Sequence, residues 1–107
     1  MASATCSFDA WLAALQDVAG PLESRLDRAA ELSRRLLDVR VRFTKVTGPR
    51  WAYLAGERGE FPGAGPLQRE VLAPGIGLMT DAADRLTPDE AARMTNALRA
   101  LVNEERP

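Results

Sequence analysis

The 107-residue sequence contains no histidine, one cysteine and one lysine. Without histidine there is no imidazole acid, base or metal ligand, and no Ser-His or Cys-His nucleophile pair. The single cysteine, Cys6, can form neither an internal disulfide nor a thiolate zinc cluster. These absences exclude most familiar catalytic groupings, so we expect no catalytic residues, no metal site and no cofactor.

Long apolar runs are also missing from the sequence. No stretch reaches the roughly 18 apolar residues that a transmembrane helix needs. The first twenty residues carry no basic side chain, and Asp9 and Asp17 interrupt their apolar pattern, which is unlike a secretory signal peptide. We therefore expect a cytoplasmic protein with no membrane association. Abundant arginine and alanine beside a single lysine favour a GC-rich bacterial genome.

The residues that are present suffice for one globular domain. Apolar residues make up 46% of the chain and charged residues 27%, and the formal net charge is -1. A chain of this length buries about 60% or more of its unfolded surface. We expect residues 1–107 to form a single domain with a radius of gyration of about 13 Å. Residues 1–6 are expected to form a flexible tail.

The first third of the chain predicts two helices. Apolar residues recur at spacings of three and four from Phe8 to Leu37, with Ser7 as a suitable N-cap. Gly20-Pro21 interrupts this pattern, because a proline removes a helical hydrogen bond and clashes with the preceding turn. We predict one helix over residues 8–19 and a second over 21–38. The alternative is a single kinked helix that projects into a dimer.

The centre of the chain predicts β-structure. Apolar and polar residues alternate from Val39 to Thr44, which is typical of a strand with one buried face. A turn at residues 47–50 (Thr-Gly-Pro-Arg) and a second strand over 51–55 complete an antiparallel hairpin. Residues 67–73 are ambiguous, and we favour a third short strand over a single helical turn.

Two helices are expected after Pro74. Gly75-Ile76-Gly77 is interpreted as a turn and helix start, because Leu78, Ala82 and Leu86 then fall on one helical face. Thr87-Pro88-Asp89-Glu90 is the signature of a capping box with proline in the first turn, followed by an amphipathic terminal helix. The predicted fold class is α+β: an N-terminal helix pair, an antiparallel hairpin with a third strand, and C-terminal helices.

Basic residues are concentrated around the hairpin. Residues 34–50 contain six basic residues and one acidic residue. The guanidinium group of arginine can form paired hydrogen bonds with phosphate oxygens, and aromatic rings stack on unpaired bases. The candidate binding residues are therefore Arg40, Arg42, Arg50, Trp51 and Tyr53. The alternative interpretation is that Arg40 and Arg42 merely lie on the solvent-exposed outer face of a sheet, while Trp51 or Tyr53 packs in the core.

Three functional hypotheses follow from the sequence. The first is a small non-catalytic accessory or interaction protein that forms a homodimer or binds a protein partner, because a few helices cover only one face of a small sheet. The second is a nucleic-acid-binding regulator that uses the basic hairpin, residues 39–55. The third is a small-ligand-binding protein or an enzyme that uses loop 56–66, where Glu57 and Glu60 are two carboxylates.

Overall fold

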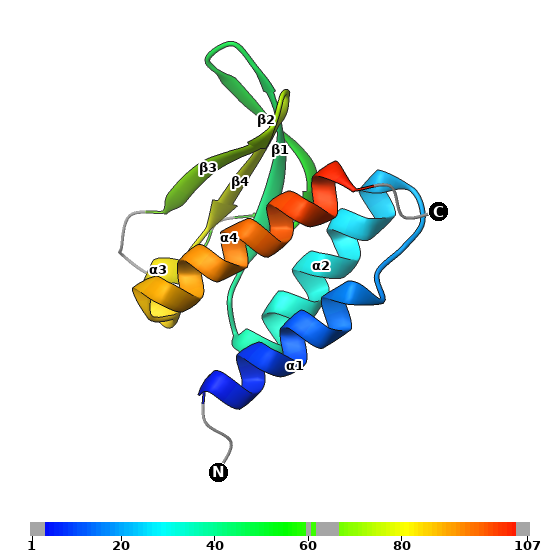
Figure 1. Ribbon diagram of the computed structural model, residues 1–107. Coiled ribbons are helices and arrows are strands. Elements are labelled where there is room, and N and C mark those ends of the chain that lie inside the picture. The colour runs from blue at the N-terminus through cyan, green and yellow to red at the C-terminus, as the bar shows by residue number, and fades with distance from the viewer. Residues whose placement is uncertain (1–3, 60, 62–66, 105–107) are drawn as a thin grey trace.

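The computed structural model describes residues 4–59, 61 and 67–104, and their side chains from Phe8 onward. Its elements are α1 (Ala4–Gln16), α2 (Leu22–Leu37), β1 (Val41–Thr47), β2 (Arg50–Gly56), β3 (Gln68–Ala73), β4 (Ile76–Thr80), α3 (Ala82–Arg85) and α4 (Pro88–Asn103). Helices α1, α2 and α4 form one layer, and the four strands form the other (Figure 1). The α+β class is confirmed, and the radius of gyration is 13.0 Å.

Helices α1 and α2 are separate, as Gly20-Pro21 predicted. Gly20 has a φ of 102°, which favours glycine, and Pro21 stands immediately before α2. Helix α1 begins at Ala4, so residues 4–6, which the sequence placed in a flexible tail, belong to the helix, and residues 1–3 lie outside the described residues.

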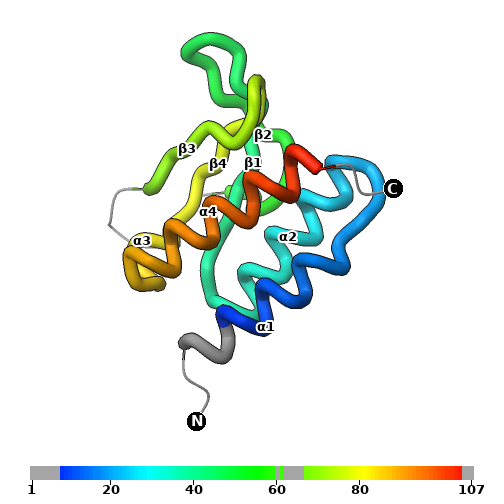
Figure 2. The backbone as a smooth tube through the Cα atoms, in the orientation of Figure 1, coloured from blue at the N-terminus to red at the C-terminus, as the bar shows by residue number. Residues whose placement is uncertain are grey.

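The sheet is antiparallel throughout, in the order β2-β1-β4-β3. The chain path therefore places both hairpins side by side, with β1 and β4 in the centre (Figure 2). Phe43 lies opposite Ala55 on β2 and Leu78 on β4. The predicted third strand over residues 67–73 is confirmed as β3.

The prediction of a helix starting near Leu78 is wrong, because residues 76–80 form strand β4. Leu78 and Ala82 are four residues apart, and this spacing returns a side chain to the same side in a strand as well as in a helix. Helix α3, which follows, has only four residues. The capping box is confirmed: Thr87 Oγ1 accepts from the Glu90 backbone N–H, and the Glu90 carboxylate accepts from the Thr87 N–H.

The core lies between the helices and one face of the sheet. Its largest fully buried side chains include Trp11 of α1, Phe43 of β1 and Leu98 of α4. Hydrogen bonds made by side chains join the helices to one another. The Trp11 indole N–H donates to Ser33 of α2 at 3.0 Å, and Arg25 of α2 donates to the Leu101 carbonyl of α4 at 2.7 Å. Among the described residues, no helix is long and apolar enough to cross a membrane.

Candidate functional site

One face of the sheet is packed against the helices, and the opposite face, here named the open face, is not. Residues paired across an antiparallel ladder point to the same side, and successive residues point to opposite sides. Because Val41 and Phe43 are buried in the core, their paired and alternating neighbours define the open face. These are Arg42, Thr44, Val46, Trp51, Tyr53, Arg69, Val71, Gly77 and Met79.

The side chain of Trp51 crosses the middle of the open face. Trp51 comes from edge strand β2, yet a Cβ placed on Gly77 of β4 would meet its six-membered ring at 2.5 Å. The indole therefore reaches over β1 and rests on Gly77, where only a glycine leaves room for it. The ring is a preformed aromatic platform that stays partly exposed.

A second aromatic residue and two arginines lie beside this platform. Tyr53 is 41% exposed, and the Arg58 guanidinium lies 4.8 Å from the centre of its ring. The Arg42 guanidinium lies 5.0 Å from the centre of the Phe61 ring and donates to the carbonyl oxygens of Glu57 and Gly59. Cation–π contacts of this kind hold flat cationic groups against aromatic faces. Arg42 thereby fixes the start of the loop after β2 at the margin of the open face.

These side chains surround a surface hollow of about 520 Å³. Its walls are Arg42, Thr44, Trp51, Tyr53, Arg58, Gly59 and Met79. Thr44 is only 1% exposed, and its hydroxyl has no hydrogen-bond partner among the described residues. An unpaired buried hydroxyl costs about 1–3 kcal/mol. The Thr44 hydroxyl lies at the floor of the hollow, beneath the Trp51 ring. A ligand would therefore reach this hydroxyl only if the indole shifted.

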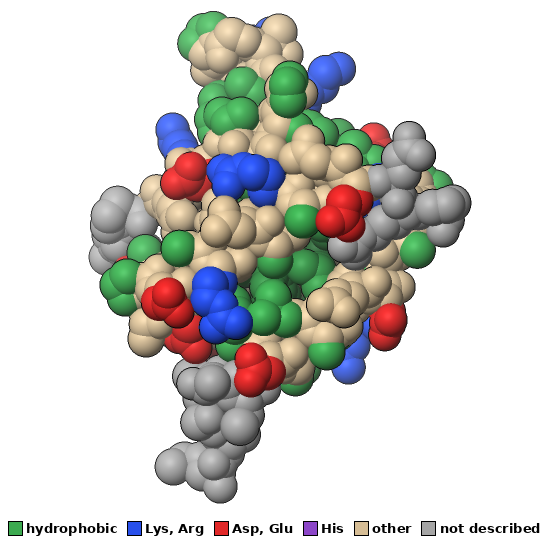
Figure 3. Space-filling model, in the orientation of Figure 1, with side chains coloured by type: hydrophobic (Ala, Val, Ile, Leu, Met, Phe, Trp, Pro, Cys, Tyr) green, Lys and Arg blue, Asp and Glu red, His purple; other side chains and the backbone are tan. Residues whose placement is uncertain are grey.

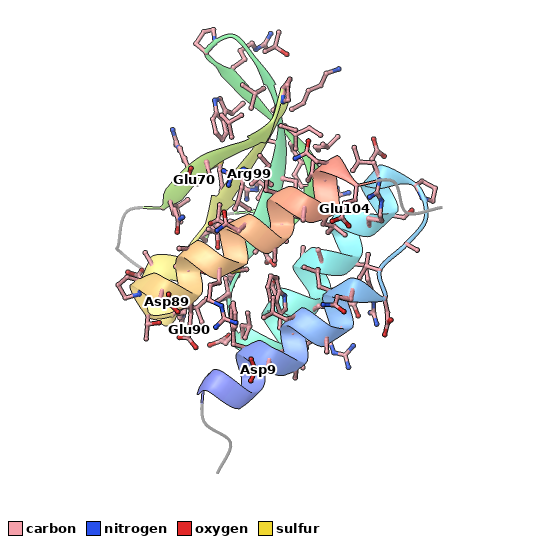
Figure 4. The ribbon with its side chains drawn as sticks, viewed as in Figure 1. Asp9, Glu70, Asp89, Glu90, Arg99 and Glu104 are labelled. Carbon is pink, nitrogen blue, oxygen red and sulfur yellow. The ribbon has the colours of Figure 1, made fainter. Side chains whose placement is uncertain are left out.

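The charge on the open face has one sign. Its strand positions carry Arg42 and Arg69, and no acidic residue. Arg42, Arg58 and Arg69 form no ion pair with any described residue. On the helix side of the molecule, acidic side chains are interspersed with basic ones (Figure 3). Figure 4 labels Asp9 of α1, Asp89 and Glu90 of α4, and Glu104, which directly follows α4. The net charge of -1 therefore conceals a locally cationic sheet face.

The structure brings together three of the five candidate binding residues: Arg42, Trp51 and Tyr53 share the open face. Arg40 lies elsewhere, because it precedes β1 and its backbone N–H donates to Asp81 at 2.8 Å. Its side chain is 17% exposed, with Asp81 at 3.9 Å. Arg50 is exposed at the hairpin turn, one residue before Trp51, and alternation directs it to the other side.

Several residues of the open face were not singled out from the sequence. Arg58 follows β2, Arg69 lies on β3 and Met79 lies on β4. Alternation along residues 67–73 would have placed Arg69 and Val71 on one face of a strand. Whether Arg69 and Val71 lie on the same face as Trp51 depends on the order of the strands in the sheet, and no local sequence pattern gives that order.

Loop 56–66 is only partly described. The Glu57 carboxylate accepts from Arg34 at 3.2 Å and so is already paired. Glu60 lies outside the described residues, so the structure does not place the second carboxylate of this loop. In the described parts of the chain, no group of three or more cysteine, aspartate or glutamate side chains could hold a metal ion.

In the comparisons with known proteins, no family model, no curated protein and no solved structure matches this chain.

Proposed function

We propose that this chain is a non-catalytic binding protein and that its ligand docks on the open face of the sheet. The observation that carries the proposal is the Trp51 ring seated on Gly77 in the middle of that face. The two exposed large hydrophobic residues of the described chain, Tyr53 at 41% and Val71 at 52%, lie on the same face. Exposed aromatic residues beside arginines are typical of binding hot spots.

A second copy of the chain fits this face poorly. A two-fold interface places the same surface of each subunit against the other, so the arginines of both copies would meet. Like charges opposed across an interface are unfavourable, and the strand positions of the open face, all of them described, offer no carboxylate to relieve them. The homodimer expected from the sequence stays a prediction, and it would have to use another surface.

The edge of β3 is also a poor place for strand addition. Side chains of α4 cover it: Arg99 donates to the Val71 carbonyl at 3.4 Å, and Asn103 donates to the Leu72 carbonyl at 3.1 Å. Such cover protects an edge strand from pairing with another chain. These contacts therefore favour the open face over the edge of β3 as the docking surface. The cytoplasmic location expected from the sequence stays a prediction.

A photo-crosslinking amino acid at Val71 tests the proposal without assuming a ligand. Val71 points outward from the open face, so we expect covalent adducts when the variant is irradiated in an extract of its own cells. The matched control carries the same amino acid at Arg35, which is exposed on α2. Adducts are detected as a mass shift of the purified, denatured chain.

Adducts from position 71 and none from position 35 would support the open face as the docking surface. Equal yields from both positions, or adducts from position 35 alone, would contradict it. An adduct to a second copy of the chain at position 71 would also contradict the argument from like charges.

A further inference from the structure

We propose that the ligand of the open face is single-stranded nucleic acid, an inference that rests on the proposed docking surface. Such a ligand combines flat apolar bases with regularly spaced negative charges. The open face combines aromatic rings with arginines that have no carboxylate partner in the described chain. Its chemistry is therefore complementary to both parts of the ligand.

The aromatic residues match the bases. Trp51 and Tyr53 are separated by one residue on β2, so both point outward, and their cross-strand partners are Val46 and Thr44. Sequence-tolerant binding of single strands uses such rings as stacking platforms, because every base has a flat π-face. The Arg58 guanidinium already lies over the Tyr53 ring, 4.8 Å from its centre, which indicates that a flat group fits against this ring.

The arginines match the phosphates. Arg58, just after β2, and Arg42, on the neighbouring strand β1, lie beside the aromatic residues, and Arg69 lies on β3 at the other edge of the sheet. Strands spaced by about 4.8 Å place β2 and β3 about 14 Å apart, so a strand of several nucleotides can contact both sides. Arginine binds phosphate oxygens with paired hydrogen bonds.

Other anionic ligands fit less well. In a duplex the flat faces of the bases are stacked on each other and are not accessible to protein rings. An acidic peptide would pair with the arginines but has no flat groups to cover Trp51 and Tyr53. Thr44 adds one hydroxyl donor beneath the indole, in reach of a base edge only when the ring moves.

The test is a titration with fluorescein-labelled oligothymidylate and oligouridylate of about twelve nucleotides, within the ~4–16 nucleotides that a small single-strand-binding domain covers. Anisotropy gives the affinity at a series of salt concentrations. Trp51 emission gives a second readout, because Trp11 is fully buried. We expect binding that quenches tryptophan emission, with log K falling against log salt at a slope of about -2 for three phosphate contacts.

Two sets of variants separate stacking from charge. Trp51→Ala and Tyr53→Ala should each weaken binding about tenfold, since loss of one stacking ring costs roughly that factor. Arg58→Ala and Arg69→Ala should each make the salt slope shallower by about 0.7. The matched control is Arg35→Ala, an exposed arginine of α2 whose ion pair is with Glu31, which should change neither quantity.

Three results would overturn the inference. One is no binding of either oligonucleotide at low salt, and another is binding that Trp51→Ala and Tyr53→Ala leave unchanged. The third is equal binding of oligoglutamate or of a duplex of the same length. If the position-71 adducts then survive nuclease and the attached mass is identified as peptide, the ligand is a protein, and the docking surface stands while this inference fails. Absence of position-71 crosslinks removes the docking surface itself.

Discussion

Replacing Gly56 by alanine is expected to destabilise the fold by about 3 kcal/mol, the combined effect of backbone strain and overpacking. Gly56 has a φ of 93°, a conformation that side chains with a Cβ rarely adopt. The added methyl group would also lie 2.6 Å from the Val41 carbonyl oxygen and 3.2 Å from Cβ of Ala30. That carbonyl cannot easily retreat, because it accepts from the Glu57 N–H at 2.8 Å.

Thermal unfolding followed by circular dichroism measures the effect. A loss of this size should lower Tm by more than about 10 °C in a domain of this length. Gly20→Ala is the matched control: its φ of 102° is equally unfavourable, but a Cβ there meets nothing within 4 Å. It should lose about 1–2 kcal/mol from backbone strain alone. Equal losses in both variants would show that the close approach of α2, β1 and β2 at Gly56 is unimportant.

Trp11→Ala is expected to be the most damaging core substitution, with a loss of about 3–5 kcal/mol. The indole is fully buried, packs against Phe8 with ring centres 5.5 Å apart and donates to Ser33. It thereby joins α1 to α2. Since small domains are stable by only about 5–15 kcal/mol, this change removes a large part of the total.

The control for Trp11→Ala is the same substitution at Trp51. Trp51 lies partly exposed on the open face, so its removal leaves no cavity in the core between helices and sheet. We expect Trp51→Ala to lose less than half as much stability in urea unfolding monitored by circular dichroism. If both variants lost the same stability, Trp51 would be a structural residue, and a binding defect in Trp51→Ala could not be attributed to stacking.

Local patterns predicted most elements of the fold. The helix break at Gly20-Pro21 and the capping box at Thr87 depend on backbone chemistry that acts within a few residues, so the sequence alone reveals them. Strand β4 was missed, because the spacing of Leu78 and Ala82 fits both a helix and a strand. Gly77 contributed to the error, because two glycines at positions 75 and 77 suggested a turn. In the structure Gly77 lies within strand β4, and its missing side chain leaves room for the Trp51 ring.

The site was harder to predict than the fold. The basic and aromatic residues of the hairpin are neighbours in sequence, so Arg42, Trp51 and Tyr53 could be grouped. Arg40 has the same alternation as Arg42, but β1 begins only at Val41, and the backbone N–H of Arg40 donates to Asp81, the residue after β4. Arg69 joins the site only through the strand order, which is set by long-range packing.

The arrangement also explains how a chain with net charge -1 can present a cationic surface. Several of the acidic residues lie in the helices, where Glu31 pairs with Arg28 at 3.0 Å and with Arg35 at 3.5 Å. The helix layer thus neutralises much of its own charge. Electrostatic attraction depends on the local field at a face, so the net charge of the whole chain is a poor guide to its ligands.

Backbone chemical-shift mapping by NMR is the most direct test of the central claim, that the open face is the binding surface. The spectrum of the ¹⁵N-labelled chain is recorded with and without unlabelled oligothymidylate. We expect shifts for residues 42–46, 51–54, 69–71 and 77–79, and unchanged signals along α1 and the exposed side of α2. Shifts confined to the helices, or no shifts at concentrations at which anisotropy reports binding, would contradict it.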